Sequence, residues 1–403
     1  MGLEEAKQEQ NRLYNIMIII GIVFVSFNLR PGITSVGPLF GMIREDLSLA
    51  SWGAGLLTSL PLLAFALISP IAPTLGRRLS NERAILVGLF FLVIGIGVRS
   101  ISWIVFLFFG TFLVGLGIAI CNVLLPGFIK EKYPLKVALM TGVYSTMMSV
   151  FAASASGLSI PFAVDFQMGW QVALLVWGLP AIIAIVVWIY LDKHKKSKEK
   201  VEMRYITPSS KGGMWKSPLA WQIALFMGLQ STMFYVTISW LPEILTDYGV
   251  SLVTAGWFVS LAQFIGLPAS FIVPIIAGKF ASQRLLVTVL SIMMISGFTG
   301  LWLGSSTWML IICITLIGIS LSGNFALALT FLGLRARTST DAAELSGMAQ
   351  SIGYLLAAVG PFAIGLLFDI TQTWEIPLIV LICNVGVMYI FGLFAGRNKY
   401  VLD

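Results

Sequence analysis

Long apolar segments recur along the chain and limit what it can fold into. Of its 403 residues, 58% are hydrophobic and 11% are charged, which is roughly half the charged fraction of an average soluble domain. Because about 20 apolar residues in a helix cross the hydrocarbon core of a bilayer, these segments predict an all-α membrane protein. Twelve segments are long enough, approximately at residues 13–40, 50–74, 84–100, 103–128, 137–163, 171–191, 217–241, 252–277, 285–304, 307–333, 342–367 and 375–395.

The basic residues predict how these helices are oriented. An even number of spans puts both termini on the same side of the membrane. If that side is the cytoplasm, 22 of the 25 lysines and arginines lie in cytoplasmic segments, as the positive-inside rule requires. The exceptions are Arg30 inside the first span, Arg44 in the first outer loop and Arg99 at the outer end of the third span. We therefore expect a multi-pass protein of a cell membrane with both termini in the cytoplasm.

The composition also argues against several functions. The net charge of +7 does not come from one basic patch with interleaved aromatic residues, so we expect no nucleic-acid partner. The 3 cysteines lie in separate apolar segments and the single histidine lies among lysines, so the sequence predicts no metal site, disulfide framework or cofactor. The chain has no metalloprotease, hydrolase-elbow or phosphate-loop motif, and we expect no catalytic residues and no enzyme.

The two halves of the chain repeat each other. The loop GRRLSNER at residues 76–83 returns as GKFASQR at residues 278–284. Because each half holds an even number of spans, both copies enter from the same side, a parallel repeat that transporters use to build a central site. This predicts a six-helix bundle at residues 1–191, a cytoplasmic linker at 192–216 and a second six-helix bundle at 217–403. Other matching pairs are Ala54-Gly55 with Ala255-Gly256, Asn122 with Asn324, and Pro161-Phe162-Ala163 with Pro361-Phe362-Ala363.

An arginine inside the first span marks the predicted binding site. Translocon scales place the cost of a cationic side chain near a helix centre at roughly +2.5 to +3.5 kcal/mol. Next to Arg30, Pro31 lacks the backbone donor that would bond the Phe27 carbonyl, and Asn28 adds a polar side chain. Such defects are tolerated at membrane depth only beside protein or a water-filled cavity. This helix is therefore expected to face a polar pathway, with Arg30 as its fixed positive charge for a small anion.

Polar side chains in otherwise apolar spans predict which helices line that pathway. Gln230, Gln263 and Tyr354 fall near the middles of their spans and Arg30 lies roughly 6 Å outward of its own, so the four can meet around one ligand. For each uncharged residue, the alternative is an interhelical hydrogen bond that only holds the bundle together, typically ~0.6 kcal/mol and at most ~1.7. The predicted set is Arg30, Asn28, Gln230, Gln263, Tyr235 and Tyr354 for substrate binding, and Asn122, Asn324, Tyr144, Gln350 and Glu344 for gating or coupling.

The positions of the acidic residues bear on how transport would be coupled. Every aspartate and glutamate falls in a loop or at the end of a span, whereas a proton-coupled transporter usually keeps a titratable carboxylate or histidine inside the membrane. A coupled proton would then travel on the substrate, or through Glu344 or Asp341 at the cytoplasmic mouth. An arginine, always charged and with a planar fork of donors, suits an anion or a carboxylate-like planar group.

Several motifs resemble a known family. The six-plus-six repeat with a basic central loop looks like the major facilitator superfamily over essentially the whole chain, although GRRLSNER lacks the aspartate of that superfamily's loop motif. More specifically, FNLRPGITSVGPL from Phe27, NVLLPGFIKEKYP from Asn122 and MTGVY from Met140 resemble the cyanate and 2-nitroimidazole porter family. The resemblance implies a bacterial inner-membrane carrier for small planar or anionic solutes that works by alternating access. It also implies that Asn28, Arg30 and Asn122 belong to the family signature.

Other functions stay open at this stage. Drug or metabolite efflux is an alternative, because the same superfamily performs it, but a central arginine disfavours lipophilic cations. An anion channel is less expected, since channels are commonly symmetric oligomers with filter rings, whereas this chain carries its repeat internally and is expected to act as a monomer.

Overall fold

The computed structural model describes residues 2–48, 51–194, 213–304 and 306–403, without the side chains of residues 2–12, 40–41, 51–56, 58 and 252–253. Most of the predicted linker 192–216 therefore lies outside the described residues, as do the side chains of Ala54 and Gly55. The described backbone consists of helices and short connections, with no β-strand among them. The predicted all-α fold class is confirmed.

The number of spans agrees with the sequence. In the described part of the chain, 11 helices are long and apolar enough to cross a membrane, or up to 12 if one bent pair forms a single span. That pair is Ser59–Ile68 with Ala72–Leu79, bent by 55°, and it corresponds to the predicted second span. Pro73 lies in the first turn of the second helix of the pair, where a missing backbone donor does no harm.

The helices form two compact units. Unit 1 is Met1–Leu125 with Val150–Gly213, and unit 2 is Pro126–Ser149 with Met214–Asp403. The helices that start in unit 1 or pass through it are α1 (Gly2–Ser26), α2 (Pro31–Thr34), α3 (Val36–Leu47), α4 (Ser51–Ile68), α5 (Ala72–Leu79), α6 (Asn81–Arg99), α7 (Ile104–Lys132), α8 (Val137–Ile160), η1 (Pro161–Asp165), α9 (Gly169–Leu175), η2 (Val176–Gly178) and α10 (Leu179–Lys193). Those of unit 2 are α12 (Gly213–Lys216), α13 (Pro218–Asp247), α14 (Leu252–Lys279), α15 (Arg284–Leu303), α16 (Thr307–Leu334), α17 (Ser339–Thr371) and α18 (Glu375–Ala395).

Residues 126–149 belong to unit 2 although they precede the linker. The Ser145 hydroxyl in α8 donates to the Ser270 carbonyl oxygen in α14 at 2.8 Å, and the Thr146 and Ser270 hydroxyls lie 3.2 Å apart. These bonds join α8 to α14 inside one unit. The division into bundles at 1–191 and 217–403, drawn from the repeat, stays a prediction.

Unit 1 has its own apolar core around α3. Side chains of α3, among them Val36, Leu39 and Ile43, pack with Trp170 and Leu174 of α9. By contrast, α10 keeps Leu179, Ile182, Ile183 and Val186 exposed, as expected for a helix whose apolar face meets lipid. The sixth span therefore lies at the edge of unit 1, as its lack of polar side chains indicates.

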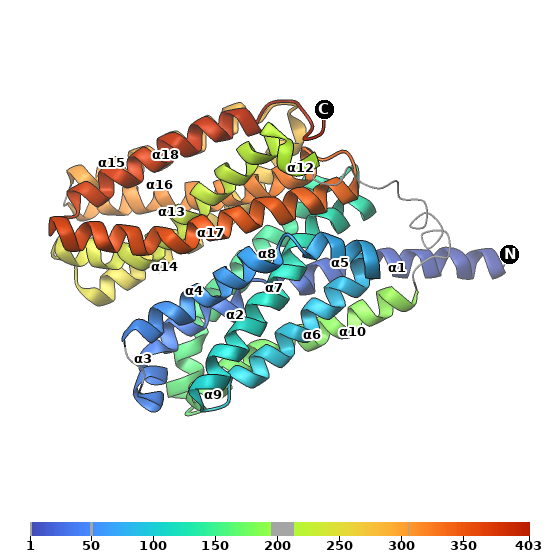
Figure 1. Cartoon of the computed structure of the whole chain (residues 1–403), viewed down its shortest axis with the longest axis horizontal. Helices are drawn as coiled ribbons and strands as arrows, with labels where there is room; N and C mark the ends of the chain where they lie inside the picture. Colours follow the sequence, from blue (N-terminus) through green and yellow to red (C-terminus); the bar gives the residue numbers. More distant parts are fainter. Residues whose placement is uncertain (1, 49–50, 195–212, 305) are drawn as a thin grey trace. The chain divides into compact units, whose positions relative to one another are not determined.

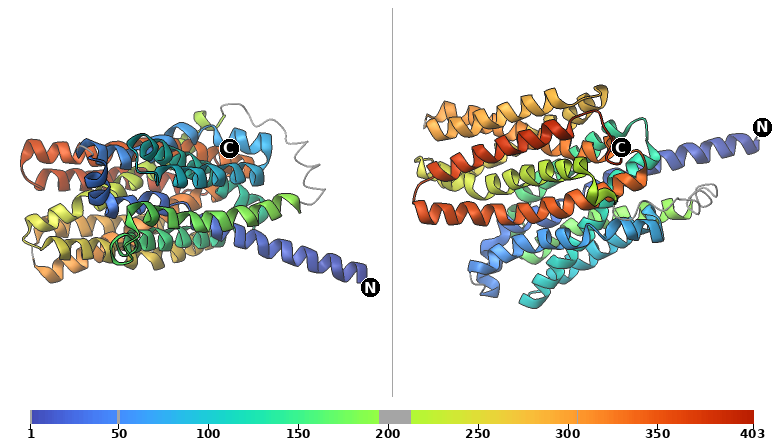
Figure 2. Two further views of the ribbon diagram at one scale, coloured as in Figure 1. Left: turned by 90° about the horizontal axis from the view of Figure 1, so that it is seen from below. Right: turned by 45° about the horizontal axis from the view of Figure 1, so that its top comes forward.

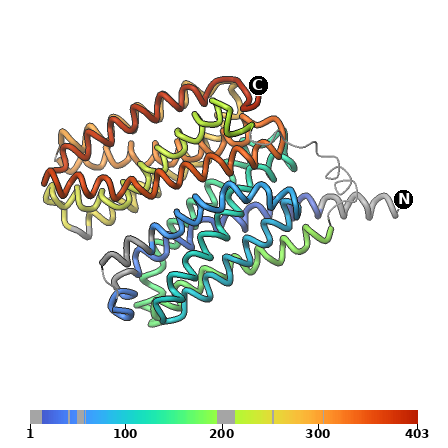
Figure 3. Tube along the Cα trace, in the orientation of Figure 1, coloured from blue at the N-terminus to red at the C-terminus, as the bar shows by residue number. Residues whose placement is uncertain are grey.

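In unit 2 the long helices run along a common direction (Figure 3), and α13 lies beside α17 in each view (Figures 1 and 2). Glycines allow this close approach: a Cβ added at Gly228 of α13 would lie 3.1 Å from the Cα of Gly353 in α17. Small residues at such contacts are typical of helix packing in membranes.

Hydroxyl side chains begin most helices of unit 2. The side chains of Ser217, Ser251, Ser306 and Thr338 each accept a hydrogen bond from the backbone N–H three residues later. Such caps satisfy donors that a helix leaves open and are each worth about 0.5–2 kcal/mol. They begin the helices near the predicted starts of their apolar segments.

Candidate functional site

The first span is interrupted at the position that the sequence predicts. Between the end of α1 at Ser26 and the start of α2 at Pro31, the backbone forms turns: Asn28 N–H bonds the Val25 carbonyl at 2.9 Å and Leu29 N–H bonds the Ser26 carbonyl at 3.3 Å. These three-residue spacings tighten the helix end. Pro31 lacks a backbone donor, so the helical register cannot continue through the Phe27 carbonyl.

Asn28 supports the end of α1. Its side chain is 3% exposed, and its Nδ2 donates to the Phe24 carbonyl oxygen at 2.6 Å. The amide therefore supplies a hydrogen bond to one of the last carbonyls of the helix, which lack partners inside it. This gives Asn28 a structural role at the site, beside the substrate-binding role that the sequence predicts.

Arg30 is the residue immediately before α2. Its backbone lies at φ −125° and ψ −39°, and its carbonyl accepts hydrogen bonds from Ile33 N–H at 2.9 Å and Thr34 N–H at 3.0 Å. The residue is only 9% exposed. The structure therefore places the arginine within the body of unit 1, at the break itself.

Helix α8 holds both sides of the break. The rings of Phe27 and Phe151 stack with centroids 3.7 Å apart. On the other side, the Thr34 hydroxyl donates to the Ala152 carbonyl at 3.2 Å, and the Ser156 hydroxyl donates to the Thr34 carbonyl at 3.4 Å. All these residues belong to unit 1, so the break has a defined geometry within that unit.

A second arginine reaches the same break. Arg99, the last residue of α6, is completely buried, and its Nη1 donates to the carbonyl oxygen of Gly32 in α2. Among the described residues, its Nε and Nη2 have no hydrogen-bond partner. The sequence predicts for Arg99 only a position at the outer end of the third span. The sequence feature that could have marked Arg99 is its predicted position away from the cytoplasmic side, which it shares with Arg30 and which departs from the positive-inside rule.

The other predicted binding residues belong to unit 2. Gln230 of α13 is buried and its Nε2 donates to the Leu321 carbonyl of α16 at 3.1 Å, so it acts at least as an interhelical tie. Tyr354 of α17 is buried, whereas Gln263 and Tyr235 are half-buried, and Tyr235 meets the Phe234 ring edge-to-face at 5.3 Å. Because these residues and Arg30 belong to different units, their meeting around one ligand stays a prediction.

The predicted gating residues differ in their surroundings. Gln350 is buried and its Nε2 donates to the Ser346 hydroxyl at 2.8 Å, whereas Glu344 is half-buried. Asn324 and Tyr144 are fully buried, and within the described residues neither the Asn324 amide atoms nor the Tyr144 hydroxyl have a hydrogen-bond partner. Asn122, which matches Asn324 in the repeat, is 2% exposed in α7.

Comparison with known proteins decides the family. The model of the Major Facilitator Superfamily matches residues 17–361. This chain belongs to the Major Facilitator Superfamily. The solved structure of the proton:xylose symporter XylE shares the fold, with a TM-score of 0.77, 10% identity, and coverage of 97% of this chain and 97% of XylE.

Relatives within this superfamily match over nearly their full length. The chain is 46% identical to the uncharacterized transporter YycB of Bacillus subtilis (strain 168), covering 97% of this chain and 96% of the relative. It is 39% identical to the 2-nitroimidazole transporter of Escherichia coli (strain K12), covering 96% and 97%. It is 25% identical to the cyanate transport protein CynX of the same strain, covering 94% and 97%. The predicted resemblance to the cyanate and 2-nitroimidazole porters is thereby confirmed.

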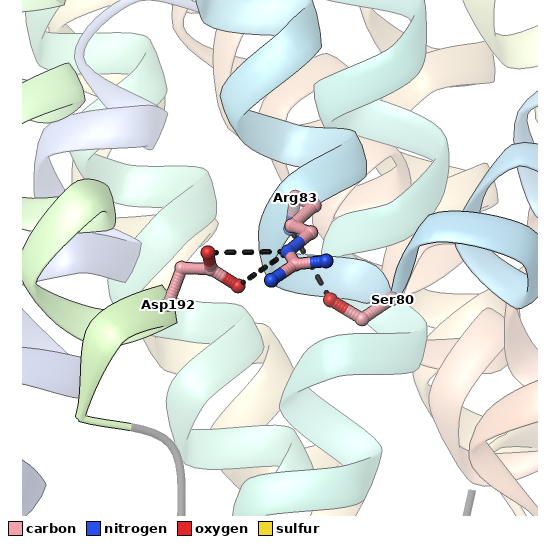
Figure 4. A network of polar contacts seen from close by, with 3 residues as sticks. All are labelled: Ser80, Arg83 and Asp192. Atoms are coloured by element: carbon pink, nitrogen blue, oxygen red, sulfur yellow. Dashed lines mark hydrogen bonds and ion pairs between the residues drawn. The ribbon is translucent and has the colours of Figure 1, made fainter. Parts of the chain in front are cut away.

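The loop GRRLSNER is bonded to the last helix of unit 1. Ser80, at φ 88°, begins α6 and accepts a hydrogen bond from Arg83 N–H at 3.4 Å. The Arg83 Nε then donates to both carboxylate oxygens of Asp192 in α10, at 3.0 and 3.2 Å (Figure 4). GRRLSNER has no aspartate, and Asp192 supplies the carboxylate that pairs with its last arginine.

The second copy of the loop makes a corresponding connection in unit 2. Arg284 matches Arg83 in the repeat, and its Nε donates to the Leu393 carbonyl of α18 at 3.3 Å. Both arginines therefore lie in the first turn of the third span of their half, α6 or α15, and bond the last helix of that half, α10 or α18. The repeat seen in the sequence extends to these contacts.

No metal site is evident in the described part of the chain, where no three His, Cys, Asp or Glu side chains gather closely enough to hold an ion.

Proposed function

We propose that this chain is a secondary transporter that moves a small anionic or planar polar solute, such as a cyanate- or nitroimidazole-like molecule, across a bacterial plasma membrane by alternating access. Both termini would lie in the cytoplasm, and the monomer would be the working unit. The names of the two Escherichia coli relatives support this substrate class.

Arg30 carries the proposal. A permanently charged side chain stands at a helix break inside the otherwise apolar span Leu13–Leu39. A charge at that depth is expensive and is usually kept for function. The guanidinium presents a planar fork of donors that matches carboxylate-like and other planar acceptors. The backbone N–H and C=O groups that the helix break leaves unbonded add polar groups beside the guanidinium.

The remaining predicted residues take supporting roles in this proposal. Asn28, Gln230, Gln263, Tyr235 and Tyr354 would contribute polar contacts to the solute. Asn122, Asn324, Tyr144, Gln350 and Glu344 would act in gating or coupling. A coupled proton would travel on a weakly acidic substrate or through Glu344.

The first test is uptake into proteoliposomes containing the purified protein. Cyanate, nitrate, nitrite, short carboxylates and nitroimidazoles are screened as labelled solutes, with counterflow to distinguish a carrier from a channel. Arg30→Ala should abolish nearly all uptake of the anion that the screen identifies. Arg30→Lys should restore little, because lysine keeps the charge but loses the planar fork.

The matched control is Arg44→Ala, since Arg44 is exposed and stands on the same predicted side of the membrane; its uptake should equal that of the wild type. Wild-type-like anion uptake by Arg30→Ala would refute the anion assignment. Cation transport that persists in Arg30→Ala would favour drug efflux instead.

A further inference from the structure

We infer that Arg99 is a positioning residue of the anion site at the break. It orients α2 through the Gly32 carbonyl and adds a second fixed positive charge, so that affinity for anions depends on the charge of Arg99 as well as on Arg30. This inference rests on the proposed function and extends it to a residue that the sequence did not assign to the site.

The location of Arg99 supports a role at the break. Gly32, whose carbonyl accepts the hydrogen bond from Nη1, lies two residues after Arg30. Two residues of extended chain span at most about 7 Å, so the accepting residue is a close neighbour of the Arg30 backbone.

No contact of Arg99 among the described residues neutralises its positive charge. The side chain is 0% exposed, and among the described residues it forms no ion pair with a carboxylate. Its Nε and Nη2 are also without a partner there. A buried charge without a counter-ion is costly, and a hydrogen bond to a backbone carbonyl does not by itself require a charged donor. The cation is therefore expected to serve something that is negative when bound.

Close helix packing holds Arg99 in position. A Cβ added at Gly110 of α7 would lie 2.7 Å from the Arg99 Cα, and a Cβ at Gly32 would lie 2.8 Å from Val114 Cγ1. Helices α2, α6 and α7 thus meet at separations that only glycine permits. The backbone of Arg99 is therefore held close against α7, beside the break.

Two substitutions separate the charge of Arg99 from its other properties. Arg99→Gln loses the charge and keeps a neutral N–H donor on a shorter side chain, whereas Arg99→Lys keeps the charge. Uptake of cyanate and of a neutral nitroimidazole amide is measured in proteoliposomes, and cyanate binding is measured as thermal stabilisation of the purified protein against equal sodium chloride. The control is Arg44→Gln, which removes an exposed cation.

The charge should govern affinity for the anion. Arg99→Gln should raise KM for cyanate roughly tenfold and lose most of the stabilisation by cyanate, while KM for the neutral solute stays near the wild-type value. Arg99→Lys should keep KM for cyanate within roughly threefold. Arg99→Met, which has similar bulk and no donor, is the second neutral variant if Arg99→Gln does not accumulate.

Two outcomes overturn the inference while the proposed function stands: equal cyanate affinity in wild type and neutral variants, or an affinity lost as fully in Arg99→Lys as in Arg99→Gln. The first outcome would show that anion binding does not depend on the charge of Arg99. The second would show that anion binding depends on the shape of the arginine side chain and not on its charge. A wild type that neither binds nor takes up any anion of the screen overturns the proposed function, and this inference falls with it.

Discussion

At the scale of single residues, buried polar side chains in the spans of unit 2 fall into two groups. Gln230 and Gln350 use their amide nitrogens in hydrogen bonds to α16 and to the preceding turn of α17. Asn324 is as deeply buried, yet in the described part of the chain both of its amide atoms are without a partner. A buried amide that leaves its hydrogen bonds unmade costs stability, so Asn324 is the better candidate for a functional role.

Substitutions of Gln230 and Asn324 should have opposite effects on the free energy of unfolding. Gln230→Leu should lower the free energy of unfolding by about 0.6–1.7 kcal/mol, because it removes an interhelical hydrogen bond. Asn324→Leu should leave that free energy unchanged or raise it by about 1 kcal/mol, because it removes an unsatisfied polar group, and should nevertheless slow transport. Thermal unfolding in detergent and initial uptake rates measure the two effects. An Asn324→Leu variant that is less stable and transports normally would contradict the gating role.

At the scale of elements, the division of the first span between α1, α2 and α3 decides where Arg30 stands. The break combines a missing donor at Pro31, a side-chain bond from Asn28 and three contacts to α8. Pro31 is the first residue of α2, a position where its missing backbone donor is tolerated.

Pro31→Ala tests the use of the break. Alanine restores the N–H and favours a continuous helix, so thermal stability should stay equal or rise, while uptake should fall several-fold because Arg30 is displaced. A gain in stability with a loss of activity is typical of substitutions at functional sites. Pro268→Ala in the continuous helix α14 is the control and should leave uptake unchanged. A Pro31→Ala variant with normal uptake would show that the break is not required for transport.

At the scale of the whole molecule, each half has an arginine that bonds the last helix of that half, one exposed and one buried. Arg83 and Asp192 form an ion pair whose side chains are 60% and 24% exposed. In unit 2 the end of α16 instead carries Arg335, which is 3% exposed, donates to the Ala395 carbonyl at 3.1 Å and bonds Gln283 Oε1. Burial lowers the pKa of Arg335 to about 10, an effect that nearby Tyr400 partly counters, so the guanidinium stays charged at neutral pH.

The difference in exposure between Arg83 and Arg335 predicts how much each contributes to the free energy of unfolding. Arg83→Ala should cost at most about 1 kcal/mol, as exposed ion pairs do. Arg335→Ala should cost about 1.5–3 kcal/mol, because it leaves the Gln283 side chain and the end of α18 without a charged donor. Thermal unfolding of the purified variants at pH 7 provides the comparison. Equal losses for both variants would mean that burial does not separate the two connections.

Sequence alone determined the spans, the matching segments of the two halves and the missing backbone donor at Pro31. Each of these depends on local chemistry: apolar length, the spacing of equivalent residues, and a residue without a backbone donor. The sequence also singled out Arg30, since a charge inside an apolar run is visible without a structure. It could not predict which way each helix is turned, because the spans are apolar on most faces.

Tertiary structure decided the contacts that join distant segments. Arg99 meets Gly32 across 67 positions and Arg83 meets Asp192 across 109, and both contacts depend on how closely and at what rotation the helices pack. At the Arg99 contact, Gly32 and Gly110 set how closely α2, α6 and α7 approach, and no periodic pattern in the sequence indicates this separation. Arg99 therefore looked like an ordinary helix end until packing placed it against the break.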